Sequence, residues 1–367
     1  MNDPHQTEPE FDATVDIELP WPDDWHVHLR DDEMLAAVVP HSARWFRNAL
    51  VMPNLVPPVS SVAQAVAYRE RIMELAVNTS APEPSVFNPL MALYLNDDLD
   101  VDDLVQGFSQ ADIAAVKYYP AGATTNSQYG STSMLDLVDK FEVLAEHQIP
   151  VAVHAESTDP SIDIYDRERS FLDTELAPLL DKVKGLRITV EHISTAAGID
   201  FVKSYPNMAG TITPHHLACD RTDLLANGLR PDLYCKPILN SPQDRLALVD
   251  AATSGDHRFF LGTDSAPHPS THKYRETASA GVFNAPYAIP VVAEVFYQSG
   301  AIDKLENFVS INGSAHYQCE PAAKTLRLRR RNVQGEEPAG RVVTASGQIV
   351  TIFGVDAARN WHLSHAV

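Results

Sequence analysis

Short apolar or β-branched runs alternate along the chain with segments of helical spacing. Eight runs have the length of a strand, at 24–29, 48–53, 89–95, 112–119, 150–156, 187–193, 209–215 and 258–264. The helical segments include 61–76, 134–147, 167–182, 241–254 and 285–298. This alternation predicts a parallel sheet with crossover helices, and eight strands are the number that closes an α/β barrel of the (β/α)8 TIM type. An open, doubly wound sheet is the competing architecture, because strand order cannot be read from a sequence.

The chain of 367 residues is long enough for one large domain or two ordinary ones, since α/β barrels often exceed about 200 residues as a single domain. We expect the barrel to span residues 16–320. Residues 1–15 are polar and acidic, which predicts a loose N-terminal segment. Residues 321–367 predict a C-terminal extension that packs on the barrel, largely irregular but with a short strand pair around "RVVTASGQIVTIF".

The chain is strongly acidic, with 28 Lys and Arg residues against 49 Asp and Glu residues and a net charge of -21. Nucleic acids and anionic membranes are polyanions, so this charge argues against both as partners. The three cysteines, Cys219, Cys235 and Cys319, form no CxxC pair, which suits a reducing compartment. No apolar run approaches the roughly 20 residues of a membrane span, and the N-terminus lacks the features of a signal peptide. We therefore expect a cytoplasmic protein.

The run "WHVHLRD" at 25–31 places His26, His28 and Arg30 at alternate positions. Residues i, i+2 and i+4 of a strand share one face, so all three side chains are expected to point into the barrel. A single inward histidine is usually a hydrogen-bonded core residue. Two at this spacing can chelate one ion, because neutral imidazole is a good zinc ligand.

Side chains that commonly bind metals also stand at the ends of three other predicted strands: His154 in "VAVHAE", His192 in "ITVEHI" and Asp264 in "FLGTDSAPH". In a (β/α) barrel the carboxyl ends of the strands converge on one site. Each of these residues alone is more often structural than functional. Four histidines and one aspartate from four separate strands together predict a metal site.

Lys117 follows "IAAV" near the end of the fourth predicted strand. A lysine that faces a barrel interior is costly unless paired, and one alternative is that its side chain reaches out to solvent. Ligand counting suggests another role. Two divalent ions would share only five ligands from the four histidines and Asp264, and a pair held about 3.5–4 Å apart needs a bridging anion. A lysine amine that has captured carbon dioxide becomes an anionic carbamate that could form this bridge.

These motifs resemble those of the metal-dependent amidohydrolase superfamily, and within it the dihydroorotases of the short, monofunctional bacterial and fungal type. The resemblance runs from "WHVHLRD" to "SINGSAHY" and includes "VMPNL", "KYYPAGATTNS", "VHAESTD", "EHIST", "YCKPIL", "RFFLGTDSAPH" and "GVFNAP". It implies two zinc ions per subunit. The implied ligands are His26, His28 and Asp264 for the more buried ion, His154 and His192 for the other, and, as bridging N6-carboxylysine, Lys117.

The reaction that the resemblance implies is the reversible cyclisation of N-carbamoyl-L-aspartate to L-dihydroorotate, the third step of de novo pyrimidine (UMP) biosynthesis. Two zinc ions would lower the pKa of a bridging water towards neutrality, and the resulting hydroxide would attack the ring carbonyl. Asp264 would be the proton shuttle, taking the proton of the hydroxide and passing it to the departing amide nitrogen. We expect a small-molecule substrate and, from the family, a homodimer.

Arg30 suits a bidentate grip on the substrate carboxylate, since its planar fork matches carboxylate geometry. The alternative for Arg30 is an ion pair with Asp31 or Asp32. By resemblance, the other substrate contacts come from Asn54, His268, the backbone of Ala280, and Thr124 and Thr125 on a loop, 121–127, that closes over the substrate.

Two positions depart from the pattern of the dihydroorotases. Lys236 stands where leucine is typical; its backbone groups would still contact the ring amide, and its charge would lie near the mouth of the pocket. His215 stands where glutamine is common. We interpret His215 and the adjacent His216 as structural, because the ligand set is already complete.

Two other functions stay open. A dihydropyrimidinase, hydantoinase or allantoinase would share the metal ligands but not the whole set of Arg30, Asn54 and His268. A non-catalytic, metal-free partner subunit would require lost ligands, whereas Lys117, Asp264 and all four histidines are present. Zinc is favoured by ligand type, although cobalt or manganese could substitute.

Overall fold

The computed structural model describes residues 11–76, 87–108, 112–331 and 337–365. Its centre is a sheet of eight parallel strands that neighbour one another in chain order. The strands are β2 (Asp24–Val27), β3 (Asn48–Val51), β4 (Asn88–Leu95), β5 (Ile113–Tyr118), β6 (Val151–Val153), β7 (Ile188–Val190), β8 (Met208–Ile212) and β9 (Phe259–Leu261). Each overlaps one of the eight predicted runs, and most are shorter.

Just beyond β9 the chain returns to β2 and closes the sheet. The Asp264 N–H donates to the His26 carbonyl at 2.8 Å, and the His28 N–H donates to the Ser265 carbonyl at 3.0 Å. A doubly wound sheet reverses its strand order part-way, whereas this order never reverses. The predicted (β/α)8 barrel is confirmed, and the open sheet is wrong. The closing bonds also bring the "HVH" and "TDS" motifs side by side.

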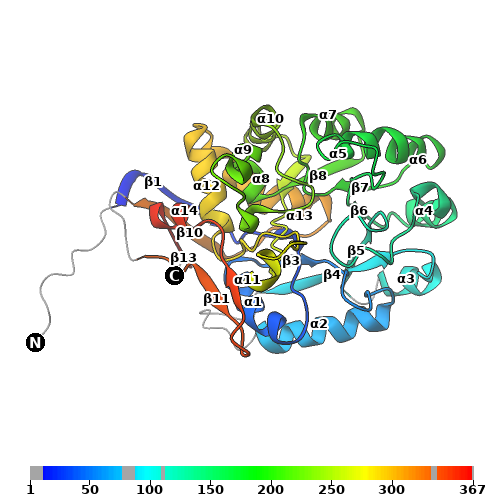
Figure 1. The fold of residues 1–367 in the computed structure, drawn as a ribbon, viewed down its shortest axis with the longest axis horizontal. Helices are drawn as coiled ribbons and strands as arrows, with labels where there is room; N and C mark the ends of the chain where they lie inside the picture. Colours follow the sequence, from blue (N-terminus) through cyan, green and yellow to red (C-terminus); the bar gives the residue numbers. More distant parts are fainter. Residues whose placement is uncertain (1–10, 77–86, 109–111, 332–336, 366–367) are drawn as a thin grey trace, which may run out of the picture.

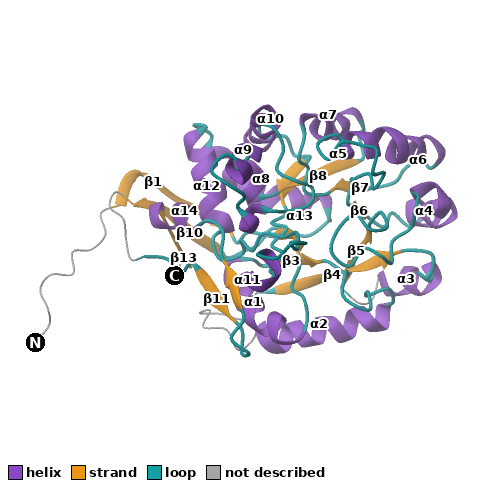
Figure 2. Cartoon of the chain, viewed as in Figure 1, coloured by secondary structure: helices purple, strands orange, loops and turns teal. Residues whose placement is uncertain are grey.

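Helices surround the strands (Figure 1, Figure 2). The longer ones are α1 (Asp32–Trp45), α2 (Val62–Ala76), α3 (Val101–Phe108), α4 (Val138–Glu146), α7 (Ala196–Ser204), α10 (Pro242–Thr253) and α12 (Ala288–Gln298). Shorter ones are α5 (Arg167–Phe171), α6 (Ala177–Lys182), α8 (Pro214–Ala218), α9 (Arg221–Leu225), α11 (Ser270–Lys273), α13 (Asn312–His316) and α14 (Val355–Asn360). None of the helices within the described ranges has the length and apolar character that crossing a membrane requires.

The sequence itself marks where several helices begin. Thr195 caps α7 by accepting from the Gly198 N–H. Ser241 and Asp244 form a capping box at the start of α10, whose first residue is Pro242. The five predicted helical segments are helical in the structure. In the segment 167–182, a π-helical turn at Leu172–Leu176 joins α5 to α6.

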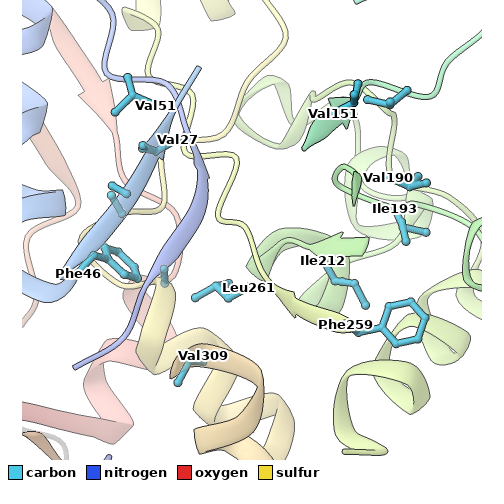
Figure 3. Close-up of a cluster of buried hydrophobic side chains, with 14 of the residues drawn as sticks. Val27, Phe46, Val51, Val151, Val190, Ile193, Ile212, Phe259, Leu261 and Val309 are labelled. Carbon is cyan, nitrogen blue, oxygen red and sulfur yellow. The ribbon is translucent and has the colours of Figure 1, made fainter. Parts of the chain in front are cut away.

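The outward faces of the strands pack against the helices and form the main apolar core. Figure 3 shows ten of its residues with labels: Val27, Phe46, Val51, Val151, Val190, Ile193, Ile212, Phe259, Leu261 and Val309. A second core fills the barrel interior beneath the strand ends, from Trp25, Leu50, Met52, Leu90, Ala92, Ala115, Ala209, Phe260 and Tyr317. Because apolar side chains occupy the rest of the interior, polar chemistry is confined to the carboxyl ends of the strands.

Trp25 is the largest side chain of this inner core. Its ring stacks on Tyr317 at a centroid distance of 4.5 Å and meets Phe260 edge-on at 6.4 Å. Gly313 of α13 lies against the same indole, and a Cβ atom added at Gly313 would lie only 2.1 Å from the Trp25 Nε1 atom. Glycine is therefore required where α13 meets the barrel.

Segments from the two ends of the chain form a separate antiparallel sheet in the order β1 (Phe11–Pro20), β10 (Thr325–Arg331) and β13 (Trp361–His365). The Asp16 carboxylate of β1 pairs with Arg327 of β10 at 2.6 Å, so opposite charges face each other across the strands. Of the segment 1–15, expected to be loose, residues 1–10 lie outside the described residues and residues 11–15 belong to β1.

The C-terminal extension contains a strand pair, β11 (Arg341–Val343) and β12 (Ile349–Thr351), and lies beside the barrel (Figure 1). Trp361 Nε1 donates to a Glu294 carboxylate oxygen of α12 at 2.7 Å, and the Phe353 N–H donates to the Phe283 carbonyl at 2.8 Å. The domain boundaries at residues 15 and 320 stay predictions.

Replacing Gly313 by alanine sets the higher helix propensity of alanine against the overpacking caused by its methyl group. Alanine favours a helix by about 1 kcal/mol, but the added methyl group overlaps a fully packed indole, and overpacking costs typically about 1–3 kcal/mol. We expect Gly313→Ala to lower the free energy of unfolding, measured by urea denaturation. Gly340→Ala is the matched control, because no atom lies within 4 Å of the added carbon there. A stabilised Gly313→Ala variant would contradict this account of the inner core.

Candidate active site

The side chains predicted as metal ligands gather where the strands end. His26 lies on β2 and Lys117 on β5, while His154, His192 and Asp264 follow β6, β7 and β9 within three residues. All are buried, as is His28. One cavity of about 20 Å³ is lined by His28, His154, His192 and Asp264. The structure therefore brings these side chains to one end of the barrel, and their role as metal ligands stays a prediction.

Three of these side chains aim one atom each at a common point. The His26 and His28 Nε2 atoms are 3.3 Å apart, and they lie 3.3 Å and 3.1 Å from Asp264 Oδ1. A tetrahedral zinc ion with bonds of about 2.0–2.1 Å holds its ligand atoms about 3.3–3.4 Å apart. The three atoms thus stand at the spacing that one zinc ion requires, and they form one of two candidate metal groups of the described residues.

Hydrogen bonds on the far side of each ring fix which nitrogen faces this point. His26 Nδ1 lies 2.6 Å from Glu191 Oε2, and His28 Nδ1 lies 2.8 Å from Asn54 Oδ1. Both oxygens can only accept, so each Nδ1 carries the hydrogen and each Nε2 presents a lone pair. Lone pairs this close repel one another unless a cation lies between them.

The pKa values of the two rings differ in a way that suits this arrangement. Burial lowers the pKa of His28 to about 4, so this ring is neutral. Burial also acts to lower the pKa of His26, but the carboxylates of Glu191 and Asp264 together outweigh burial and raise it. A metal ion at this point would compete with protons for the two Nε2 atoms, so metal affinity should depend on pH.

His154 and His192 form a second pair beside the first. His154 Nε2 lies 3.0 Å from Glu156 Oε2, so it carries the hydrogen, and His154 Nδ1 faces His192 Nε2 at 3.1 Å. The His192 ring is 5.0 Å from the His26 ring between centroids. Burial lowers the pKa of both His154 and His192, which keeps both rings available as neutral ligands.

Lys117 is fully buried, and its Nζ atom has no hydrogen-bond partner among the described residues. The alternative that this side chain reaches out to solvent is therefore wrong. Burial lowers the pKa of Lys117 to about 8, so a substantial fraction of the amine is neutral near that pH. Its Nζ atom lies 5.1 Å above the centre of the Tyr119 ring. A buried amine that is partly neutral and has no hydrogen-bond partner among the described residues, beside two histidine pairs, is consistent with a chemically modified lysine.

The backbone is strained where three site residues leave their strands. Arg30, His192 and Asp264 have φ angles of 61°, 41° and 43°, in the left-handed region that side chains disfavour. β2 ends at Val27, so the expected strand alternation holds for His26 but does not extend to Arg30. Instead, Arg30 lines the cavity from a residue in the left-handed backbone conformation, beyond the end of the strand.

Arg30 lines the same cavity and has no carboxylate partner among the described residues. Its Nη2 atom lies 3.0 Å from His268 Nε2, and its Nε donates to the Pro267 carbonyl at 3.2 Å. Asp31 pairs instead with Arg71 of α2 at 2.8 Å. The alternative of an Arg30 ion pair with Asp31 or Asp32 is not observed. His268 lies behind Arg30 rather than in the cavity lining.

The loop 121–127 lies over the cavity in a closed arrangement. Asn54 Nδ2 donates to the Thr125 carbonyl at 2.9 Å, and Thr125 Oγ1 donates to the Ala280 carbonyl at 3.5 Å. The Lys236 ammonium donates to the Ala123 carbonyl at 2.6 Å, so its charge tethers the loop. The cavity, lined also by Thr124, has room for little more than a water molecule in this arrangement of the loop. A larger cavity of about 750 Å³ lies between α10, α12 and the C-terminal extension, away from these residues.

Sequence reasoning missed the buried glutamates that hold the histidines. Glu191 faces the barrel interior from the residue after β7 and also accepts from Thr211 Oγ1 at 2.7 Å. Glu168 of α5 accepts from the N–H groups of Ser194 and Thr195, which fixes the turn after His192. Burial raises the pKa of Glu168 to about 7. The only available signal was an acidic residue inside an apolar run, "ITVEHI".

His215, His216 and Cys235 form the other candidate metal group. Both nitrogens of His216 are already used, with Thr213 Oγ1 at 2.8 Å and the Pro237 carbonyl at 3.1 Å. The Cys235 thiol donates to the same carbonyl at 3.2 Å. These bonds join the start of α8 to the segment that carries Lys236, which agrees with the structural interpretation of His216. His215 contacts Asn284 Nδ2 through its Nδ1 atom at 3.2 Å, and its Nε2 atom has no partner among the described residues.

Comparisons with known proteins agree with this geometry. Residues 24–322 match the model of the amidohydrolase family. A dihydroorotase of Ruegeria pomeroyi is 46% identical over 96% of this chain and 99% of its own. The structure of dihydroorotase from Saccharomyces cerevisiae, solved with 5-fluoroorotic acid, has a TM-score of 0.84 at 29% identity, covering 96% of this chain and 99% of that one. Dihydroorotase from Campylobacter jejuni has a TM-score of 0.83 at 33% identity, covering 95% and 98%. The chain belongs to the amidohydrolase family and, within it, to the dihydroorotases.

Proposed function

We propose that the chain interconverts N-carbamoyl-L-aspartate and L-dihydroorotate, a step of de novo pyrimidine synthesis. The observation that carries this proposal is the Arg30 guanidinium, which lines the cavity of the candidate metal ligands without a carboxylate partner of its own. The expected substrate supplies that carboxylate on a cyclic amide. Support also comes from the yeast dihydroorotase that was solved with a ring acid, 5-fluoroorotic acid.

We propose that the candidate ligands hold two zinc ions per subunit, which the group of His26, His28 and Asp264 supports for one of them. When bound, the ions would supply Lewis acidity towards an amide carbonyl and lower the pKa of water towards neutrality. The proposed ligands are His26, His28 and Asp264 for one ion and His154 and His192 for the other. A homodimer and a cytoplasmic location stay predictions.

Lys117 is the proposed bridge between the two groups, as N6-carboxylysine. Its neutral Nζ would add to the carbon of carbon dioxide and lose a proton, which yields a carbamate whose single negative charge is shared by two oxygens. The lowered pKa of the amine favours this addition, because only the neutral form is nucleophilic. The missing hydrogen-bond partner of Nζ is the local observation that supports the modification.

Asp264 is the proposed proton shuttle. Burial alone would raise its pKa, but contacts with the His26 and His28 rings outweigh burial and hold the pKa well below 3.8. The carboxylate is therefore ionised and able to accept a proton. In ring opening it would take the proton of the attacking water and pass it to the departing amide nitrogen, and ring closure reverses these steps.

The substrate carboxylate is proposed to lie against Arg30, within reach of the Ala280 backbone. Asn54 uses its oxygen on His28 and one Nδ2 hydrogen on Thr125, so one amide hydrogen remains for the substrate. Thr124 and Thr125 would contact the acid when the loop 121–127 closes, and this closure excludes water. His268 would act through its contact with Arg30.

Removing the guanidinium tests the substrate assignment. Arg30→Met keeps an unbranched side chain, and we expect kcat/KM for dihydroorotate to fall about 30-fold or more, because truncating one partner of a buried charge pair costs about 2 kcal/mol or more. The measurement follows the loss of dihydroorotate absorbance in the ultraviolet. Arg71→Met, which removes the surface pair with Asp31, is the control and should retain activity.

Cyclic amides without a carboxylate test the same assignment from the side of the substrate. The wild-type enzyme should open dihydroorotate in strong preference to dihydrouracil, hydantoin and allantoin, which lack the carboxylate. Preference for the uncharged rings would mean that Arg30, Asn54 and His268 are misassigned. A fully metal-loaded protein with no activity on any ring would instead indicate a non-catalytic partner subunit.

Loss of the buried amine tests the bridging role of Lys117. We expect Lys117→Ala to bind fewer than two zinc ions per chain, measured by elemental analysis, and to lose at least about 100-fold in kcat, because an anionic ligand shared by both ions is missing. Lys184→Ala, at an exposed lysine, is the control. Full metal content and activity in Lys117→Ala would refute the bridge.

Glu191→Gln tests whether the carboxylate holds His26 as a ligand. The amide has nearly the same shape but no charge, so the fold should survive. We expect zinc affinity or kcat to fall about 10- to 100-fold, which is the usual effect of removing a carboxylate behind a ligating histidine. Competition with a chelator measures the affinity. An unchanged affinity would show that Glu191 has only a packing role.

A further inference from the structure

Lys273 is a buried lysine that neither the metal site nor the substrate contacts use, and although burial lowers its pKa to about 8, most of it is still a cation at neutral pH. It ends α11, its side chain is 4% exposed, and no carboxylate of the described residues pairs with it. Its ammonium donates to the carbonyls of Tyr234 at 2.8 Å, Ser279 at 3.1 Å and Gly281 at 2.7 Å. These bonds use all three of its hydrogens. Because burying a charge is costly unless it is hydrogen-bonded, losing any of these three contacts would be unfavourable, and the three carbonyls are held in place around the ammonium.

The three carbonyls belong to two segments that form one wall of the active-site cavity. Tyr234 lies two residues before Lys236, and Ser279 and Gly281 flank Ala280; Lys236, Ala280 and Gly281 line the cavity. The Gly281 N–H also donates to the Tyr234 carbonyl at 2.9 Å, so this oxygen accepts from both Gly281 and Lys273. Lys273, which does not itself line the cavity, therefore joins both segments.

The segment around Ala280 has little freedom once it is joined in this way. Gly281 has a φ angle of 148°, and a Cβ atom there would lie 2.5 Å from the Ala266 carbonyl and 2.9 Å from the His268 ring. The wall thus packs directly against the residue that contacts Arg30. Any movement of the Ala280 backbone would change the part of the cavity proposed to receive the substrate acid.

The charge of Lys273 acts on the same region. Burial lowers the pKa of His268 to about 2, and the charges of Arg30 and Lys273 act in the same direction. The positive charges of Arg30, which lines the cavity, and of Lys273, which does not, therefore both act on His268. An anionic group beside Arg30 is stabilised by both, because a buried charge is screened weakly.

We propose that Lys273 is a positioning residue for the substrate carboxylate: it fixes the main chain of Ala280 and adds positive charge behind it. This inference rests on the proposed function. None of the carbonyls that it holds belongs to a candidate metal ligand, so Lys273 should govern affinity for the acid rather than the rate of the chemical step. The effect should appear in KM and in the Kd of acidic ligands, with metal content unchanged.

The test compares Lys273→Met with Lys273→Gln and Lys273→Arg in the zinc-loaded enzyme. Methionine removes both donors and charge, glutamine keeps donors without charge, and arginine keeps both. We expect KM for dihydroorotate and the Kd of 5-fluoroorotate, measured by calorimetry, to rise about tenfold or more in Lys273→Met at a nearly unchanged kcat. Lys273→Gln should weaken binding less, and Lys273→Arg least. If Lys273→Met does not fold, the other two variants carry the comparison.

Lys140→Met is the matched control, because the Lys140 ammonium also donates to two carbonyls, those of Asp97 and Leu99, but at α4. It should leave both constants unchanged. An unchanged Kd in Lys273→Met, or a loss confined to kcat or to thermal stability, would overturn the inference while the wild-type activity stands. A wild-type enzyme inactive on dihydroorotate would overturn the proposed function, and the Kd of 5-fluoroorotate would still decide the role of Lys273.

Discussion

The contact between His26 Nδ1 and Glu191 Oε2, 2.6 Å long, decides which nitrogen of that ring faces the active-site cavity. The amide of Asn54 does the same for His28 at 2.8 Å. With both rings held in this orientation, their Nε2 atoms and Asp264 Oδ1 lie within 3.3 Å of one another. Such a cluster is stable only around a cation, so the rest of the site depends on these two hydrogen bonds.

The packed barrel holds these closely spaced ligand atoms in place. Apolar side chains fill the interior beneath the site, and the bonds that close β9 onto β2 run directly through Asp264 and His26. The left-handed backbone at Arg30, His192 and Asp264 stores strain that a firmly packed scaffold can hold. The proposed contacts with the substrate acid lie in a different part of the molecule, the wall that Lys273 holds together and the loop to which Lys236 donates.

Much of this site could be predicted because its signals are local. The alternation at His26 and His28 and the ligand-type residues at strand ends needed only the barrel rule to bring them together. Arg30 was placed correctly but for the wrong reason, since strand spacing says nothing of a left-handed backbone. Glu191 was missed because its partner is remote in sequence. The pairing of β1 with β10 joins the two ends of the chain, and no local pattern reports such a contact.

Zinc K-edge X-ray absorption on the purified, zinc-loaded chain tests the central claim most directly, because the two candidate metal groups differ in sulfur. If the ions lie between the histidine pairs and Asp264, the nearest shell contains only nitrogen and oxygen, at about 2.0–2.1 Å. A sulfur shell near about 2.3 Å would instead place zinc at Cys235, with His215 and His216, and would contradict the account.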